Sequence, residues 1–209
     1  FEAPFIVKHN QGGKGLGVHR FDAVEHFAAH LDSPAYQPPV DGITLVQEYL
    51  WPAAPFITRV EIVGGRFVYA ITADTGRGGF ELCPADACVV RPSPADGGAA
   101  AAGDGHDAAS GAEPAGDGSA ASLFALREDL GERHPIVGSY LRFAARHGIE
   151  VAGFEFIETA DGRLVTYDVN TNTNYNPDVE ALAPRSGPAA VAEHVRDLLA
   201  AQSQREAGR

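Results

Sequence analysis

The stretch VAGFEFIETADGRLVTYDVN (151–170) decides the fold, because its residue types specify two adjacent antiparallel strands. Aromatic and β-branched residues fill both halves, and Asp161-Gly162 between them is typical of a two-residue hairpin turn. With that turn, Glu155 pairs directly with Asp168, and strand alternation places Asn170 on the same face. The opposite face is then expected to carry the core side chains Phe154, Phe156, Tyr167 and Val169.

Two carboxylates that face each other across a hairpin repel, because directly opposed Cβ atoms lie only about 4.5–5.5 Å apart. A shared hard cation removes this repulsion, and magnesium prefers oxygen ligands from one or two carboxylates. We therefore predict a metal site formed by Glu155, Asp168 and Asn170. An exposed polar sheet face is the alternative. A calcium loop beginning at Asp168 is disfavoured, since Thr173 stands where glycine is needed and Val179 where glutamate is needed.

The segment PFIVKHNQGGKGLGV (4–18) combines an apolar strand-like run with four glycines and two lysines. Glycines let the backbone approach a ligand closely, and the lysines indicate that this ligand is anionic. A P-loop is excluded because Lys14 is followed by Gly15 rather than Ser or Thr. The dinucleotide fingerprint fails because the glycines 13, 15 and 17 are evenly spaced. A glycine hairpin that binds nothing is the alternative.

The remaining elements indicate a mixed α+β protein with mainly antiparallel sheet. The run FITRVEIVGGRFVYAITA (56–73) predicts a second hairpin that turns at Gly64-Gly65. Helices are expected at 22–31 with Asp22 as N-cap, at 135–147 ended by Gly148, and at 188–202.

Composition restricts the function classes. The net charge of −12 argues against a nucleic-acid surface, and no run is long enough to span a bilayer. Segment 92–121 has no Lys, Arg or large apolar residue, so we expect a flexible insertion. The C-x4-C pair Cys83 and Cys88 lacks further zinc ligands and indicates reduced cysteines in a cytoplasmic protein. The chain starts at Phe1 and has no methionine, so we expect a fragment.

Taken together, these motifs resemble the ATP-grasp superfamily. PFIVKHNQGGKGLGV looks like the second half of the family's lid, and TLVQEYL (44–50) looks like its hinge strand. GFEFIE (153–158) and YDVNTNTN (167–174) resemble the metal motif, and FITRVEIVGGRFVYAI (56–71) is similar to the strand pair that carries an arginine. The combination most resembles glutamate-ligase-like carboxylate–amine ligases. The metal motif departs from the common pattern, because Glu and Asp are exchanged between its two strands.

The resemblance implies a role for each motif residue. Lys8 and the flap would bind the ATP triphosphate, and the hinge would bind adenine; the implied ATP-binding residues are Lys8, Gln11, Gly12, Gly13, Lys14, Gly15, Gln47, Glu48, Tyr49 and Leu50. Glu155, Asp168 and Asn170 would hold one or two Mg²⁺ ions, with Mn²⁺ as the alternative. Arg59 would be the catalytic residue, and Asn172 and Asn174 would bind substrate. A lysine at a strand end, solvated Gln47 and Glu48, and an Arg59–Glu61 ion pair are the structural alternatives.

The implied fold is a partial lid subdomain at 1–46 and a C-terminal antiparallel-sheet domain with flanking helices at 47–91 and 122–205. The family's N-terminal domain and first lid strand would be missing. The implied reaction joins a small-molecule or peptide carboxylate to an amine, such as an amino acid, through an acyl phosphate, releasing ADP and phosphate. A homo-oligomer is compatible with this function. A nucleotide-binding module without ligase activity and a structural protein without ligand are the alternatives.

Overall fold

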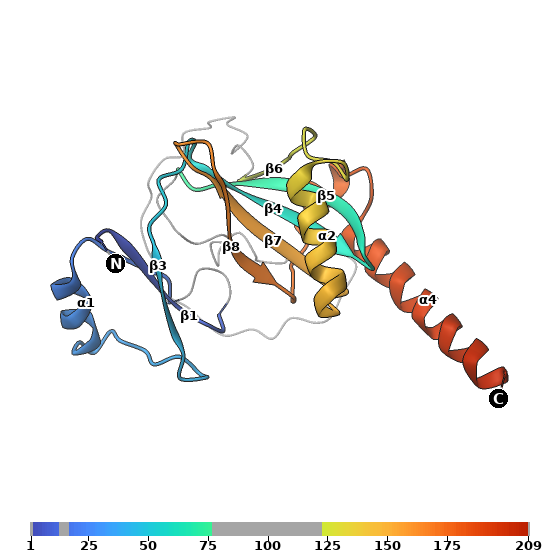
Figure 1. Ribbon diagram of the computed structural model, residues 1–209, viewed down its shortest axis with the longest axis horizontal. Coiled ribbons are helices and arrows are strands. Elements are labelled where there is room, and N and C mark those ends of the chain that lie inside the picture. The colour runs from blue at the N-terminus through green and yellow to red at the C-terminus, as the bar shows by residue number, and fades with distance from the viewer. Residues whose placement is uncertain (1, 13–16, 77–122, 209) are drawn as a thin grey trace, which may run out of the picture.

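The computed structural model describes residues 2–12, 17–76 and 123–208, which form two antiparallel sheets with four helices (Figure 1). The strands are β1 (Phe5–His9), β2 (His19–Phe21), β3 (Thr44–Glu48), β4 (Phe56–Val63), β5 (Arg66–Asp74), β6 (Phe124–Leu126), β7 (Val151–Glu158) and β8 (Leu164–Asn170). The helices are α1 (Val24–Leu31), α2 (Pro135–His147), α3 (Pro177–Leu182) and α4 (Gly187–Ala207). The expected α+β class with antiparallel sheet is thereby confirmed.

The small sheet has the strand order β2-β1-β3 and lies at the N-terminal end of the molecule (Figure 1). Its alternating residues Phe5 and Val7 are buried with Phe21, and Phe27 of α1 packs against them. The intervening residues Ile6 and Lys8 therefore point to the other face, toward the large sheet. Helix α1 begins later than expected: its N-cap is Ala23, without a side-chain cap, so the prediction of Asp22 as N-cap is wrong.

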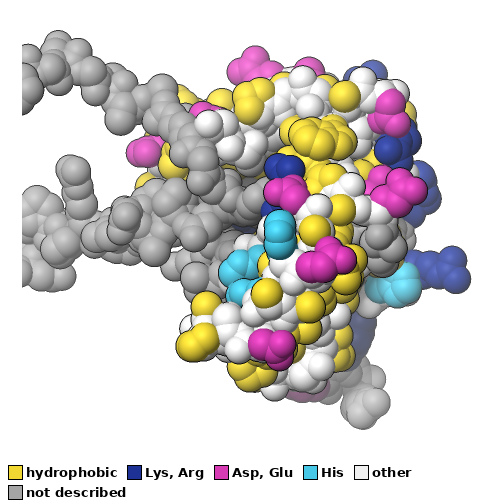
Figure 2. Space-filling view, turned by 90° about the vertical axis from the view of Figure 1, so that its left-hand side faces the viewer, with side chains coloured by type: hydrophobic (Ala, Val, Ile, Leu, Met, Phe, Trp, Pro, Cys, Tyr) yellow, Lys and Arg dark blue, Asp and Glu magenta, His cyan; other side chains and the backbone are white. Residues whose placement is uncertain are grey.

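The same end of the molecule carries a group of histidines. Figure 2 shows histidine side chains gathered among acidic and apolar ones on this face. The rings of His19 on β2 and His30 on α1 have centroids 4.7 Å apart, and the ring of His30 also meets Phe21 and Tyr36. Burial, with contributions from His30 and His9, lowers the pKa of His19.

The large sheet has the order β6-β5-β4-β7-β8, so its two hairpins pack side by side through β4 and β7. Helix α2 covers one face of this sheet (Figure 1), where Val60, Ile62, Phe154 and Phe156 form the main core with residues of the helix. The turn between β4 and β5 is confirmed at Gly64-Gly65, which both have positive φ, as the type I′ turn requires.

Two of the other helices follow the sequence pattern or extend it, and the third was not predicted. Helix α2 has the expected bounds and ends at Gly148 in the left-handed conformation. Helix α4 continues to Ala207, further than expected, and extends from the body toward the C-terminus (Figure 1). Helix α3 was not predicted; Asn176 caps it by accepting hydrogen bonds from two backbone N–H groups of its first turn, and Pro177 occupies its start.

The hairpin β7–β8 differs from the prediction in its turn. The two-residue turn at Asp161-Gly162 is wrong, because β7 ends at Glu158 and a five-residue connection, 159–163, leads to Leu164. A β-bulge follows Glu155, and it shifts the pairing by one residue so that Glu155 still faces Asp168. The longer connection and the bulge each shift the register by one residue, in opposite directions, so the predicted pairing of Glu155 with Asp168 is present.

Two predictions from sequence concern residues that the structure does not describe. The segment 92–121 and the cysteines Cys83 and Cys88 lie outside the described residues. Within the described ranges, none of the helices has both the length and the apolar character that crossing a bilayer demands.

Candidate functional site

A cleft of about 410 Å³ lies between the two sheets, within the size range of ligand pockets. The segment between β3 and β4 joins the sheets along one side of it. There the Ala53 N–H donates to the Glu158 carbonyl at 2.8 Å, and the Ala160 N–H donates to the Trp51 carbonyl at 3.0 Å. These main-chain bonds fix the position of the hinge relative to the end of β7.

Most of the residues predicted from sequence meet in this cleft. Its lining includes Lys8, Gly12, Gln47, Glu48, Tyr49, Leu50, Arg59, Glu155, Asp168, Asn170 and Asn174. Gln11 and Asn172 are described but do not line it. Gly13, Lys14 and Gly15 of the flap lie outside the described residues.

One end of the cleft is apolar and lies against the hinge. It is lined by Ile6, Phe56, Ile57, Phe124, Ile157 and Val165, from both sheets, whereas Ile71 of the lining pairs with Arg59 across β4 and β5. On β4 the cleft-facing residues change from Ile57 to Arg59 two positions later, so the same strand leads from an apolar to a charged region. Such a cleft suits a flat apolar group at one end and an anionic group at the other.

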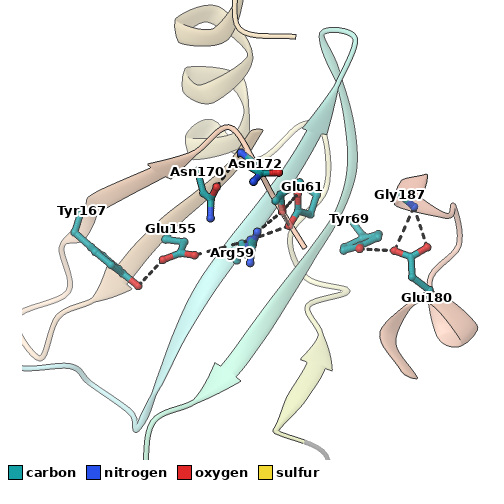
Figure 3. A network of polar contacts seen from close by, with 10 residues as sticks. Arg59, Glu61, Tyr69, Glu155, Tyr167, Asn170, Asn172, Glu180 and Gly187 are labelled. Carbon is teal, nitrogen blue, oxygen red and sulfur yellow. Dashed lines mark hydrogen bonds and ion pairs between the residues drawn. The ribbon is translucent and has the colours of Figure 1, made fainter. Parts of the chain in front are cut away.

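The acidic pair stands at the polar end. Glu155 and Asp168 are directly opposite in register, and only 2% of Glu155 is exposed. Burial raises the pKa of Glu155; the nearby Asp168 raises it further, whereas Arg59 acts against the shift. The hydroxyl of Tyr167 donates a hydrogen bond to Glu155 at 3.0 Å (Figure 3). The prediction that Tyr167 packs in the opposite core is therefore wrong, because the bulge turns it toward the cleft.

Lys8 connects the small sheet to this acidic pair. Its ammonium group donates to Asp168 at 3.0 Å and lies 3.4 Å from the Tyr167 carbonyl oxygen. The ammonium group also lies 5.8 Å from the centroid of the Tyr167 ring. In the described structure, a cation from β1 thus compensates one of the two opposed carboxylates.

Arg59 lies between two acids on the cleft face of β4 and β7 (Figure 3). Its Nε is 2.8 Å from Glu61 and 3.9 Å from Glu155. The Arg59–Glu61 ion pair considered from sequence is therefore present, and Arg59 also donates to the hydroxyl of Thr173. Asn170 uses its side-chain oxygen to accept the Asn172 N–H at 2.9 Å.

The donor set fits magnesium by its chemistry. Two opposed carboxylates and one amide oxygen are hard oxygen ligands on a single sheet face, and phosphate oxygens commonly complete such a shell. Among the described residues no three His, Cys, Asp or Glu side chains come together as a metal site. Any ion held here would accordingly depend on Asn170 and on the ligand for its further oxygens.

Comparison with solved structures identifies the fold to which this chain is similar. No family model and no curated protein matches the sequence significantly. Among solved structures, the D-cycloserine synthetase DcsG matches with a TM-score of 0.57 at 14% identity, over 95% of this chain and 56% of that one. D-alanine–D-alanine ligase from Bacillus anthracis, in complex with ATP, matches with a TM-score of 0.52 at 14% identity, over 96% and 52%. This chain has part of the ATP-grasp fold.

The chain spans about half the length of the ATP-grasp structures it matches. The ATP-grasp ligase PsnB, complexed with a precursor peptide and AMPPNP, aligns with a TM-score of 0.50 at 14% identity, over 91% of this chain and 44% of that one. The sequence-based expectation of a partial ATP-grasp fold is therefore confirmed, while the likeness at this identity concerns the fold.

Among the residues not identified from sequence as site residues, Tyr167, Thr173 and Glu61 contact predicted site residues. Tyr167 contacts Glu155 because of the bulge, and strand β8 contains no glycine that would have indicated a bulge from sequence. Thr173 contacts Arg59 through a loop whose path the sequence does not specify. Glu61 did have a signal, because an acid two residues after Arg59 in an apolar strand points to the same face.

Gly153 makes room for the Arg59 side chain. A Cβ at this position would lie 2.5 Å from the Arg59 Nε, far inside normal contact. We expect Gly153→Ala to lower the free energy of unfolding by about 1–3 kcal/mol, the usual cost of overpacking. Urea denaturation measures this, with Gly131→Ala as the control, since a Cβ there meets nothing within 4 Å. Equal stability of both variants would contradict the observed path of Arg59.

Proposed function

We propose that this chain forms the nucleotide-binding part of an ATP-dependent carboxylate–amine ligase that works through an acyl phosphate. The observation that carries the proposal is the polarity of the cleft. The hinge and apolar residues line one end, and the Glu155–Asp168 pair with Lys8 and Arg59 lines the other. This arrangement suits adenine at the first end and phosphates with a divalent ion at the second.

In this proposal the hinge residues 47–50 bind adenine against the apolar side chains, and Lys8 transfers its hydrogen bond from Asp168 to a phosphate oxygen. The flap residues Gln11, Gly12, Gly13, Lys14 and Gly15 complete the triphosphate site. Backbone N–H groups of a glycine-rich loop are well suited to this, because they point toward an anion without side-chain obstruction. The regions 1–46, 47–91 and 122–205 act as lid and catalytic domain.

Glu155, Asp168 and Asn170 would hold one or two Mg²⁺ ions, which would neutralise charge on the phosphates. Arg59 would stabilise the negative charge on the phosphoryl group as it transfers, assisted by its fixed position between Glu61 and Glu155. Phosphoryl transfer depends mainly on positioning and electrostatic stabilisation, so these residues need no covalent role.

The reaction proceeds in two displacements. A carboxylate oxygen of the first substrate attacks the γ-phosphorus, the bond to the β-phosphate oxygen breaks, and ADP leaves. The amine of the second substrate attacks the acyl carbon, phosphate leaves with the bonding pair, and the amine gives up a proton. Asn172 and Asn174 in the loop after β8 would contact the substrates, which are a small-molecule or peptide carboxylate and an amino acid.

The test uses thermal unfolding with ATP, with Mg²⁺ and with both. We expect ATP and Mg²⁺ together to stabilise the chain by more than the sum of their separate effects; a ligand at a hundred times its Kd stabilises by about 2.7 kcal/mol in total. Phosphate release by the full-length protein over a panel of amino acids and carboxylates then identifies the reaction. Binding without phosphate release would favour the nucleotide-binding module, and no stabilisation by any combination would contradict both functions.

A further inference from the structure

Glu61 is a carboxylate in the middle of β4, and only 1% of it is exposed. It does not line the cleft, but its partner Arg59 does. A buried carboxylate is costly unless cations and hydrogen bonds compensate it, so its partners indicate why it is there. Burial raises the pKa of Glu61, while Arg59 and Thr173 act in the opposite direction.

Glu61 and its partners Arg59 and Thr173 form a closed set of three side chains. The Nε of Arg59 lies 2.8 Å from one Glu61 oxygen. The Thr173 hydroxyl lies 2.8 and 3.0 Å from the two Glu61 oxygens and donates to them. Arg59 in turn donates from Nη2 to the Thr173 oxygen. Each member therefore restricts the other two.

This set determines where the Arg59 guanidinium lies (Figure 3). The side chain crosses Gly153, whose missing Cβ leaves space for it. Glu61 holds it on one side, and Glu155 lies 3.9 Å away on the other. Without Glu61, the nearest acid in the register would be Glu155, which the proposed function assigns to the metal ion.

The same set attaches a loop to the cleft. Thr173 belongs to the connection between β8 and α3, in which Asn174 lines the cleft. Its hydroxyl is fixed by both members of the Arg59–Glu61 pair. The loop and the guanidinium are consequently held in one arrangement by a single buried carboxylate.

We propose that Glu61 is a positioning residue for the proposed phosphoryl transfer. It keeps Arg59 directed along the metal-binding face and, through Thr173, keeps the loop containing Asn174 against the cleft. This role rests on the proposed function. It adds to that function a residue that orients Arg59 without contacting substrate. A purely structural role for Glu61 is the competing explanation.

The test variant is Glu61→Gln, which keeps the shape and the acceptor for Thr173 but removes the counter-ion of Arg59. We expect kcat to fall about tenfold or more, because the buried ion pair that holds Arg59 is lost. The Kd for ATP with Mg²⁺ should stay within about threefold, because binding distributes over the whole cleft. If Glu61→Gln does not fold, Thr173→Val replaces it as the test variant. It keeps the shape of the side chain, and its kcat should fall by a smaller factor.

A double-mutant cycle with Arg59→Gln separates positioning from general destabilisation. If Glu61 acts through Arg59, then Glu61→Gln should lower kcat little further in the Arg59→Gln background. Glu180→Gln is the matched control. Glu180 is a partly buried acid that accepts hydrogen bonds from Tyr69 at 2.5 Å and from the Gly187 N–H at 2.9 Å, away from Arg59. Its replacement should lower stability and leave kcat unchanged.

The outcomes are distinguishable. Wild-type protein that neither binds ATP with Mg²⁺ nor releases phosphate overturns the proposed function, and the role of Glu61 with it. Active wild type with unchanged kcat in both Glu61→Gln and Thr173→Val overturns the positioning role and leaves the proposed function standing. If the fold reductions in kcat caused by Glu61→Gln and Arg59→Gln simply multiply in the double mutant, the positioning role is also overturned. A fall in kcat that is lost in the Arg59→Gln background supports it.

Discussion

Glu155→Gln is expected to abolish magnesium-dependent turnover of ATP while making the metal-free protein at least as stable as wild type at neutral pH. The loss of turnover follows from removing a proposed metal ligand; a bound ion supplies several kcal/mol of charge stabilisation, so the rate should fall about a thousandfold or more. The gain in stability follows from burial, which together with Asp168 raises the pKa of Glu155.

The direction of the pH dependence follows from the same shift. Because the pKa of Glu155 is higher in the folded than in the unfolded protein, its ionised form opposes folding at neutral pH. This unfavourable contribution disappears as the pH falls through the raised pKa. In chelator, wild type should therefore gain stability relative to Glu155→Gln when the pH is lowered from about 7 to about 5. The Tyr167 hydrogen bond can persist in the variant, since an amide oxygen also accepts hydrogen bonds.

Unfolding midpoints in chelator and in excess Mg²⁺ check this expectation. Glu132→Gln, at an exposed position, is the control for the loss of one negative charge. Asp168→Asn should lose turnover in the same way, but its metal-free stability should change by no more than about 1 kcal/mol, because it also loses a partly exposed ion pair with Lys8. A destabilised Glu155→Gln in chelator, with no magnesium effect on wild type, would show that the pair is structural.

The acidic pair shows how far the sequence could lead. Residue alternation and hairpin chemistry were sufficient to place Glu155 opposite Asp168, and that pairing is confirmed. The predicted two-residue turn was wrong: the strands have a five-residue connection and a bulge, whose one-residue shifts of the register cancel. A bulge depends on packing around the strand rather than on a local signal, so the position of Tyr167 could not be predicted.

Many residues of the cleft were predictable from sequence, but their contacts were not. Strand alternation accounts for the separation of Phe5 and Val7, which are buried, from Lys8, which lines the cleft. That Lys8 meets Asp168, 160 residues later in the chain, depends on how the two sheets pack. The same holds for Arg59: its ion pair with Glu61 is local to one strand, whereas its contact with Thr173 needs the fold of the loop.

Lys8→Met is expected to change the binding of ATP and of Mg²⁺ in opposite directions. In the described structure, the Lys8 ammonium donates to Asp168, so it competes with a cation for that carboxylate. Removing it should weaken ATP binding about tenfold or more, the effect of one lost hydrogen bond between ammonium and phosphate. It should strengthen the binding of Mg²⁺ without nucleotide by up to about fivefold, since a partly exposed ion pair contributes up to about 1 kcal/mol.

Isothermal titration with each ligand measures both effects, and urea denaturation verifies that the variant is folded. Methionine keeps the apolar stem of Lys8 near the Tyr167 ring, so the stability should fall by no more than about 1 kcal/mol. Arg163→Met is the control, because it removes one exposed positive charge from the turn between β7 and β8. A structural lysine would lower stability by several kcal/mol and leave both affinities unchanged. Opposite shifts in the two affinities, absent from the control, require that Lys8 exchanges Asp168 for a phosphate when the nucleotide enters.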